Sequence, residues 1–168
     1  MKIIKNILFP IDFTNYSIDL LEYVILFTRS VRARLHLLHV ITSGETPSFD
    51  ELNEFFHTIR RQPPDDVTKY ALDQLDLIKI HIRDHSAAEG IVRYAGENEI
   101  DMIMVAAHAP GRPVEGPVAP TVHQVLETSP CPVMVIRIPR EGSKHQSRFE
   151  LTLQELKREV ATRREQEE

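Results

Sequence analysis

The sequence has one cysteine, Cys131, and no tryptophan. A single thiol cannot form an intrachain disulfide, which excludes a disulfide-stabilised secreted domain and favours a reducing compartment. No apolar run approaches the ~20 residues that a membrane-spanning helix needs. The N-terminal residues run into a predicted strand and show no cleavable signal pattern. We therefore expect a soluble cytoplasmic protein without a membrane partner.

An excess of charge of one sign is also absent. The 168 residues contain 20 Lys and Arg against 25 Asp and Glu, a net charge of -5. This balance indicates neither disorder nor a surface that attracts nucleic acid. The length fits one domain with a sizeable core, and there are no detectable internal repeats.

Apolar runs alternate with amphipathic segments along most of the chain. Strands are predicted at residues 3–11, 35–41, 78–82, 101–107 and 133–138, each of the first four being followed by helical periodicity. The third run alternates Ile with Lys79, His81 and Arg83, a pattern typical of an edge strand. These features predict a single-domain α/β fold with a doubly wound, parallel, five-stranded sheet of order 3-2-1-4-5.

Several residues predict where the helices begin or break. Thr14 or Asn15 can cap the first helix, and Ser48 and Ser86 each begin a capping box. Pro63 and Pro64 must interrupt the helical segment between the second and third strands.

The C-terminal segment, residues 140–168, is predicted to be a linker and an amphipathic helix. Two capping boxes, beginning at Ser147 and Thr152, offer alternative starts. The helix is expected to pack one narrow apolar seam on the domain or on a partner subunit and to pair Glu159 with Arg163. The seam residues are Phe149, Leu153, Leu156 and Val160.

Four separated motifs resemble the universal stress protein family. They are Lys-Asn-Ile-Leu-Phe-Pro-Ile-Asp at 5–12, Leu-Leu-His-Val at 37–40, Asp-Met-Ile-Met-Val at 101–105 and Pro-Cys-Pro-Val-Met-Val at 130–135. The resemblance covers residues 3 to 138 and implies a domain over 1–139 with an adenine nucleotide alpha hydrolase-like sheet. It also implies a homodimer in which the fifth strands pair antiparallel through Val133, Met134, Val135 and Ile136. A partner strand, or the chain's own tail, would cover that apolar edge.

Many members of this family bind ATP through Gly-x-x-Gly, nine residues, then Gly-Ser or Gly-Thr after the fourth strand. Here the corresponding positions are Ala106, Ala109, Ala119 and Pro120. Proline lacks the N–H and the hydroxyl that would hold a phosphate, so the sequence predicts weak or absent ATP binding. If a nucleotide does bind, the resemblance places it against Pro10, Asp12, Thr14, Val40, Ala106, His108, Ala109, Arg112, Ala119, Pro120 and Thr121.

We therefore expect a non-catalytic regulatory or stress-response protein that acts as a homodimer on an unidentified protein partner, with no cofactor. One alternative is a switch that binds ATP or AMP, or a weak ATPase, using Asp12 and the 106–120 loop. A second is a phosphoacceptor module built on Asp12 and Asp84.

No nucleophile–base set is visible. No metal site is expected, since no cluster has ligand spacing and His36 and His39 lie on opposite faces of one strand.

Overall fold

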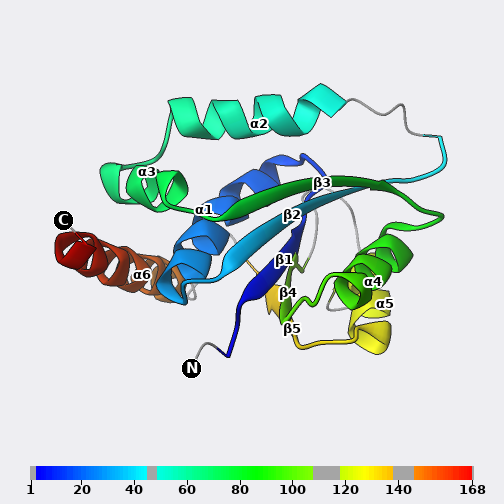
Figure 1. Cartoon of the computed structure of the whole chain (residues 1–168). Coiled ribbons are helices and arrows are strands. Elements are labelled where there is room, and N and C mark those ends of the chain that lie inside the picture. The colour runs from blue at the N-terminus through cyan, green and yellow to red at the C-terminus, as the bar shows by residue number, and fades with distance from the viewer. Residues whose placement is uncertain (1–2, 45–48, 108–117, 138–145, 168) are drawn as a thin grey trace.

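The computed structural model describes residues 3–44, 49–107, 118–137 and 146–167 (Figure 1). Strands in these residues are β1 (Asn6–Pro10), β2 (Arg34–Ile41), β3 (Leu77–Arg83), β4 (Met102–Ala106) and β5 (Val133–Ile136). Helices are α1 (Asn15–Ser30), α2 (Phe49–Arg61), α3 (Asp66–Asp73), α4 (Ala87–Glu97), α5 (Pro120–Thr128) and α6 (Gln146–Glu167).

The strands form one parallel sheet of order β3-β2-β1-β4-β5, as the sequence predicts. The strand that alternates isoleucine with polar residues, β3, lies at one edge, and β5 lies at the other. The first strand is shorter than predicted because it begins at Asn6, while the side chain of Ile3 is 78% exposed. The direction in which successive strands are added to the sheet reverses between β1 and β4, which is the topological switch point of the fold.

Two apolar layers cover the two faces of the sheet. Alternate residues of each strand, such as Leu37 and Leu38 of β2, point to opposite faces. One layer joins the sheet to α1, α3 and α6, and the other joins it to α4 and α5. Figure 1 shows these two groups of helices on opposite sides of the strands.

Local signals in the sequence set most helix boundaries. Thr14 is the N-cap of α1, and its side chain accepts a hydrogen bond from the N–H of Ser17. The chain leaves α2 at Arg61, just before Pro63, and α3 restarts behind Asp65, which caps it through the N–H of Thr68. Ser86 likewise caps α4. Ser48 lies outside the described residues.

The C-terminal helix packs on the domain along much of the predicted seam. Val160 is fully buried, and Leu153 and Leu156 pack against the α1 and α3 layer. The helix begins at Gln146, so Ser147 and Thr152 both lie inside it and neither of the two predicted caps starts it. Glu159 accepts hydrogen bonds from Arg163, as predicted. The side chain of Phe149 is outside the described residues.

Ion pairs tie α6 to the body at two points. The Nζ of Lys157 lies 2.7 Å from Glu22 of α1 and 2.6 Å from Asp65 at the start of α3. Near the end of α6, Glu167 accepts hydrogen bonds from Arg29 and from the Tyr70 hydroxyl. Because these contacts hold the C-terminal half of α6 against α1 and α3, α6 is an integrated part of the fold.

Candidate functional site

The candidate site lies at the carboxyl edge of the sheet, between β1 and β4. The chain leaves these neighbouring strands towards helices on opposite faces, α1 after β1 and α5 after β4. In open α/β sheets such a reversal of strand order leaves a crevice in which ligands bind. The residues that follow Pro10 and Ala106 are therefore placed to form a site.

The first wall of this edge is the turn after β1. The Oδ1 of Asp12 accepts hydrogen bonds from the Thr14 N–H at 3.1 Å, the Thr14 hydroxyl at 2.7 Å and the Ser17 hydroxyl at 2.6 Å. Phe13, between them, has a φ of 60°, which is a left-handed conformation that costs a non-glycine residue energy. The Asp12 hydrogen bonds hold this turn in place.

The charge of Asp12 is stabilised by the same contacts. Burial acts to raise the pKa of the Asp12 carboxyl, but the hydrogen bonds from Ser17 and Thr14 outweigh it, so the pKa lies below its ordinary value. Asp12 is therefore ionised at neutral pH, and its carboxylate accepts hydrogen bonds from Thr14 and Ser17 of the same turn. A carboxylate of this kind repels a phosphate and is suited to a hydroxyl or amine donor.

The second wall is the start of α5. Ala119 occupies the N-cap without a side-chain hydrogen bond, and Pro120 is the first helical residue. The Ala119 N–H donates a hydrogen bond to the carbonyl oxygen of Ala107 at 2.9 Å. Pro120 has no N–H. The main-chain N–H groups of Thr121 and Val122 remain as the first donors of this helix.

The other residues that the sequence assigns to a nucleotide fall into three groups. Ala106 ends β4 beside Ile136, at the same edge as Asp12. Val40 is buried and its side chain faces α4, where Gly90 lies against it, so that side chain is a packing residue. The remaining three, His108, Ala109 and Arg112, lie outside the described residues.

The acids of the phosphoacceptor alternative do not come together. Because β2 lies between β1 and β3, the ends of the strands that lead to Asp12 and Asp84 are about 10 Å apart. Asp84 instead accepts hydrogen bonds from the His85 N–H and from Arg93. The paired acids that this alternative requires are therefore not formed.

The residues expected at a subunit interface lie in β5, which is an edge strand of the sheet within the described residues. The side chains of Val133, Met134 and Val135 are partly buried, whereas Ile136 is 6% exposed and packs in the core of its own chain. Carbonyl groups of Pro132 and Ile136 accept hydrogen bonds from the β4 side of the sheet. Since such groups alternate along a strand, the N–H and C=O of Val133 and Val135 point away from β4 at this edge of the sheet.

A pair that the sequence interpretation missed lies on the α1 and α2 side of the sheet. His39 of β2 stands opposite His81 of β3, with their Nδ1 atoms 3.3 Å apart. His36 points to the other face, where its Nδ1 is 2.9 Å from the Tyr94 hydroxyl, so the prediction that His36 and His39 lie on opposite faces of the strand is confirmed. The alternating polar face of β3 was the signal that could have found the pair.

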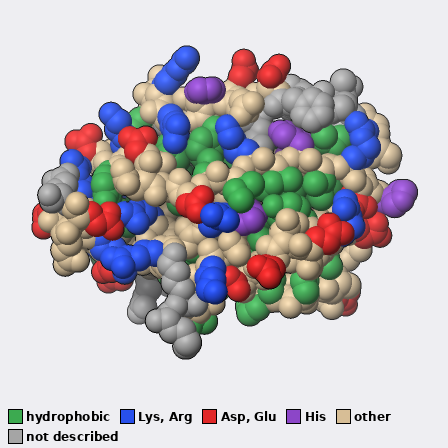
Figure 2. All heavy atoms as spheres, viewed as in Figure 1, with side chains coloured by type: hydrophobic (Ala, Val, Ile, Leu, Met, Phe, Trp, Pro, Cys, Tyr) green, Lys and Arg blue, Asp and Glu red, His purple; other side chains and the backbone are tan. Residues whose placement is uncertain are grey.

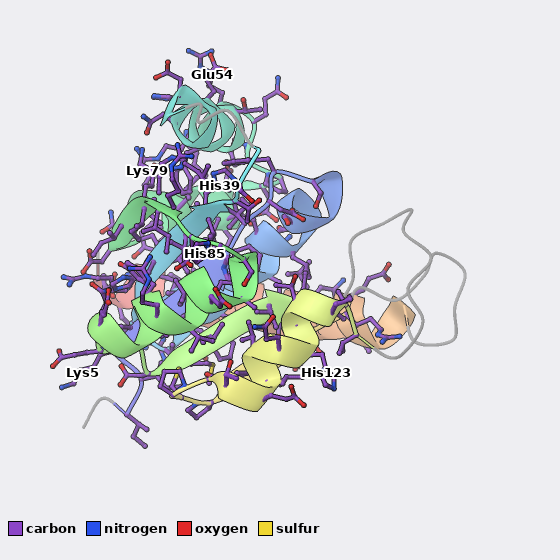
Figure 3. All side chains as sticks on the ribbon, turned by 90° about the vertical axis from the view of Figure 1, so that its right-hand side faces the viewer. Lys5, His39, Glu54, Lys79, His85 and His123 are labelled. Carbon is purple, nitrogen blue, oxygen red and sulfur yellow. The ribbon has the colours of Figure 1, made fainter. Side chains whose placement is uncertain are left out.

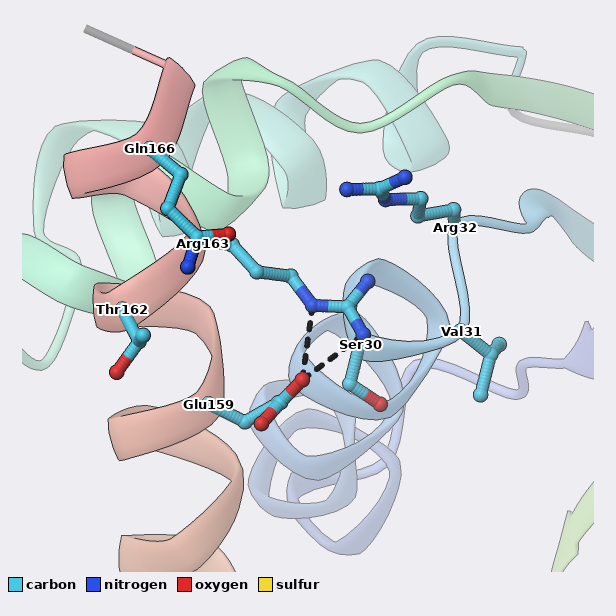
Figure 4. A pocket seen from close by; sticks show the side chains of 7 residues that line it. All are labelled: Ser30, Val31, Arg32, Glu159, Thr162, Arg163 and Gln166. Atoms are coloured by element: carbon cyan, nitrogen blue, oxygen red, sulfur yellow. Dashed lines mark hydrogen bonds and ion pairs between the residues drawn. The ribbon is translucent and has the colours of Figure 1, made fainter.

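A surface hollow lies at the opposite end of the sheet from Asp12. It has a volume of about 520 Å³ and lies between the last turn of α1 and the C-terminal half of α6, where Arg163 bonds Glu159 (Figure 4). None of the residues assigned to a nucleotide lines it. On the face drawn in Figure 2, Lys and Arg side chains are interspersed with Asp and Glu, without a broad basic stripe.

Within the described part of the chain, no three His, Cys, Asp or Glu side chains gather as a metal-binding group. Among the same residues, no helix combines the length and the apolar character needed to cross a bilayer.

A sequence model of the universal stress protein family matches residues 4–137. Solved structures share the fold, and the universal stress protein UspA from Lactobacillus plantarum is 21% identical, with a TM-score of 0.56 over 79% of this chain and 97% of its own. A universal stress protein from Archaeoglobus fulgidus in complex with dAMP is 15% identical (TM-score 0.55, 80% and 98% covered). One in complex with cAMP is 13% identical (TM-score 0.57, 80% and 97% covered). No curated protein matches.

Proposed function

This chain belongs to the universal stress protein family, and we propose that it is a non-catalytic regulatory protein that acts as a homodimer and binds ATP weakly or not at all. The observation that carries the proposal is the start of α5, where Ala119 supplies no side-chain cap and Pro120 supplies neither an N–H nor a hydroxyl. A triphosphate at this edge would therefore lack two of the donors that a serine or threonine at position 120 would give it.

The acid on the other wall supports the same proposal. Asp12 is held by Thr14 and Ser17, and its carboxylate stabilises a strained turn. A catalytic base needs a pKa near the working pH, whereas the pKa of Asp12 lies below its ordinary value. Asp12 is thus a poor base for activating water, which supports a role without ATP hydrolysis.

Calorimetry with ATP and Mg²⁺ tests nucleotide binding directly. We expect a flat titration for the natural chain, and saturable binding would overturn this part of the proposal. The double variant A119G/P120S places Gly-Ser at these positions, as in the ATP-binding members of the family. It adds a flexible N-cap, one N–H and one hydroxyl, so the affinity for ATP should increase. The variant Pro120→Ala restores the N–H but not the hydroxyl, so it separates the two contributions. Pro130→Ser, at an exposed proline outside this edge, is the matched control.

The homodimer is supported by the position of β5 at the edge of the sheet. Val135→Pro removes an N–H that points away from β4 and leaves the ladder with β4 intact, so it should convert a dimer to a folded monomer in sedimentation experiments. Met134→Pro removes an N–H on the β4 side and should destabilise the fold instead. A natural chain that sediments as a monomer at micromolar concentration would overturn the dimer.

A second candidate is a switch that binds AMP or a related monophosphate. The structures that contain dAMP and cAMP share this fold, and a monophosphate needs fewer donors than ATP. The N–H groups of Thr121 and Val122 at the start of α5 favour this candidate. The same calorimetry with AMP, dAMP and cAMP would distinguish it, since binding of a monophosphate without ATP binding is expected only for such a switch.

A further inference from the structure

Two histidines from neighbouring strands meet on the face of the sheet that α2 partly covers. His39 and His81 are register partners in β2 and β3, so their side chains leave the sheet on the same side. Their Nδ1 atoms are 3.3 Å apart, and the rings are nearly perpendicular, with centroids 5.4 Å apart. Both residues are partly buried. Figure 3 shows His39 beneath α2. His85 and His123 are exposed.

The separation of these nitrogens fits two ligands of one metal ion. Imidazole nitrogens bind Zn²⁺ at about 2.0–2.1 Å in tetrahedral sites. With nitrogens 3.3 Å apart, such bonds give an angle at the metal of about 105–110°, close to the tetrahedral value. A square-planar ion, with an angle of 90°, would need nitrogens about 2.9 Å apart at the same bond length.

We propose that His39 and His81 form a binding site for Zn²⁺ or a similar tetrahedral transition-metal ion, which joins the edge strand β3 to β2. Neutral imidazole is a ligand for such ions, whereas Mg²⁺ and Ca²⁺ prefer oxygen. The chain contributes these two nitrogens from its described residues, and water or a small anion completes the coordination. This site is independent of the proposed function at the carboxyl edge of the sheet.

The surroundings of the pair hold the rings in place and favour an anion as a further ligand. The Phe13 ring packs edge-on against His39, with centroids 4.6 Å apart. Lys79 and Arg83 flank His81 on the same face of β3, and the Nζ of Lys79 donates to Asn53 of α2 at 2.6 Å. These positive charges favour an anion such as chloride or hydroxide beside the metal.

Thermal unfolding of the full chain after treatment with EDTA tests the proposal with Zn²⁺ as the probe. A ligand that binds only the folded state raises Tm progressively with its concentration, so Tm should increase during a Zn²⁺ titration and stay constant with Mg²⁺. His39→Gln and His81→Gln should each abolish the increase. His85→Gln, which changes an exposed histidine outside the pair, should leave it unchanged. A constant Tm with Zn²⁺, or an equal loss in His85→Gln, would overturn the site.

A measurement on the natural chain covers the case in which a variant does not fold. Co²⁺ in a tetrahedral site gives intense visible d–d bands, whereas octahedral Co²⁺ gives weak ones. Imidazole nitrogen resonances of His39 and His81 should shift at lower Zn²⁺ concentrations than those of the other histidines. Weak octahedral bands, together with another histidine that shifts first, would show that the two imidazoles only hydrogen-bond to each other.

Discussion

Gly90 of α4 lies directly against Val40 of β2. A Cβ atom built on Gly90 would be 2.7 Å from Val40 Cγ1 and 3.2 Å from the Cβ of Asp84, closer than side chains pack. The glycine therefore allows α4 to approach the carboxyl half of β2. Gly96 lies in the same helix and has no atom within 4 Å of such a Cβ. A side chain at position 90 would therefore clash with β2, whereas one at position 96 of the same helix would not.

We expect Gly90→Ala to destabilise the protein. Overpacking costs about 1–3 kcal/mol, and the better helix propensity of alanine offsets about 1 kcal/mol of it. Val40 cannot move aside easily because β-branched side chains are stiff. Gly96→Ala should instead stabilise by about 0.5–1 kcal/mol. Urea unfolding measures both. A gain of stability in both variants would contradict the close approach of α4 to β2.

The docking of α6 predicts a position-dependent effect of truncation to alanine. Val160 is fully buried, whereas Leu151, on the same helix, is 56% exposed. Val160→Ala should lower the free energy of unfolding by about 1–2 kcal/mol through lost burial and a residual cavity. Leu151→Ala is the matched control and should change it by less than about 0.5 kcal/mol. Equal effects at the two positions would indicate that α6 does not pack on α1 and α3 in solution.

The buried imidazole of His36 predicts a pH dependence of stability. Burial, helped by the positive charge of Arg34 and opposed by Asp76, lowers the pKa of His36 below its ordinary value. Below pH ~6.5 the unfolded chain therefore takes up a proton that the folded chain resists. Stability should be fully present above that pH and fall as the pH decreases towards the folded pKa.

Urea unfolding between pH ~7.5 and ~5 measures this loss. His36→Gln should flatten the dependence over this range, because it removes the group that titrates. His123→Gln, at an exposed position, should leave the slope nearly unchanged. If His36→Gln kept the full slope, another group would be responsible.

The turn after β1 predicts that Asp12 and Ser17 are energetically coupled. Asp12→Ala should lower the free energy of unfolding by about 1–2 kcal/mol, since it removes the acceptor of three hydrogen bonds. Ser17→Ala should cost less in the Asp12→Ala background than in the natural chain. A double-mutant cycle measures this coupling. Strict additivity would show that the Ser17 hydroxyl does not stabilise the turn through the Asp12 carboxylate.

Local signals predicted much of the fold and its caps correctly. Thr14 and Ser86 are N-caps because their side chains reach main-chain N–H groups only a few residues away. The edge position of β3 followed from its alternating polarity. Strand ends were less accurate, as at Ile3, because apolar character continues past the last residue that a neighbouring strand can pair.

Contacts and backbone conformations that form only in the folded chain could not be predicted in this way. The sequence indicated that Asp12 lies at a strand end, but the strained conformation of Phe13 and the engagement of Asp12 by Ser17 emerged only in the folded turn. The sequence also did not indicate that the side chain of Val40 packs against Gly90 of α4. Packing of this kind depends on which helix covers which face.

By itself, the sequence determined the α/β class, the order of the sheet and the proline at the start of α5, because periodicity and backbone chemistry act over a few residues. Only the tertiary structure decided that His39 stands beside His81 and that α6 rests on α1 and α3. The histidines are far apart in the chain, and the register of two parallel strands brings them together. Register depends on the packing of whole elements, which no short stretch of sequence specifies.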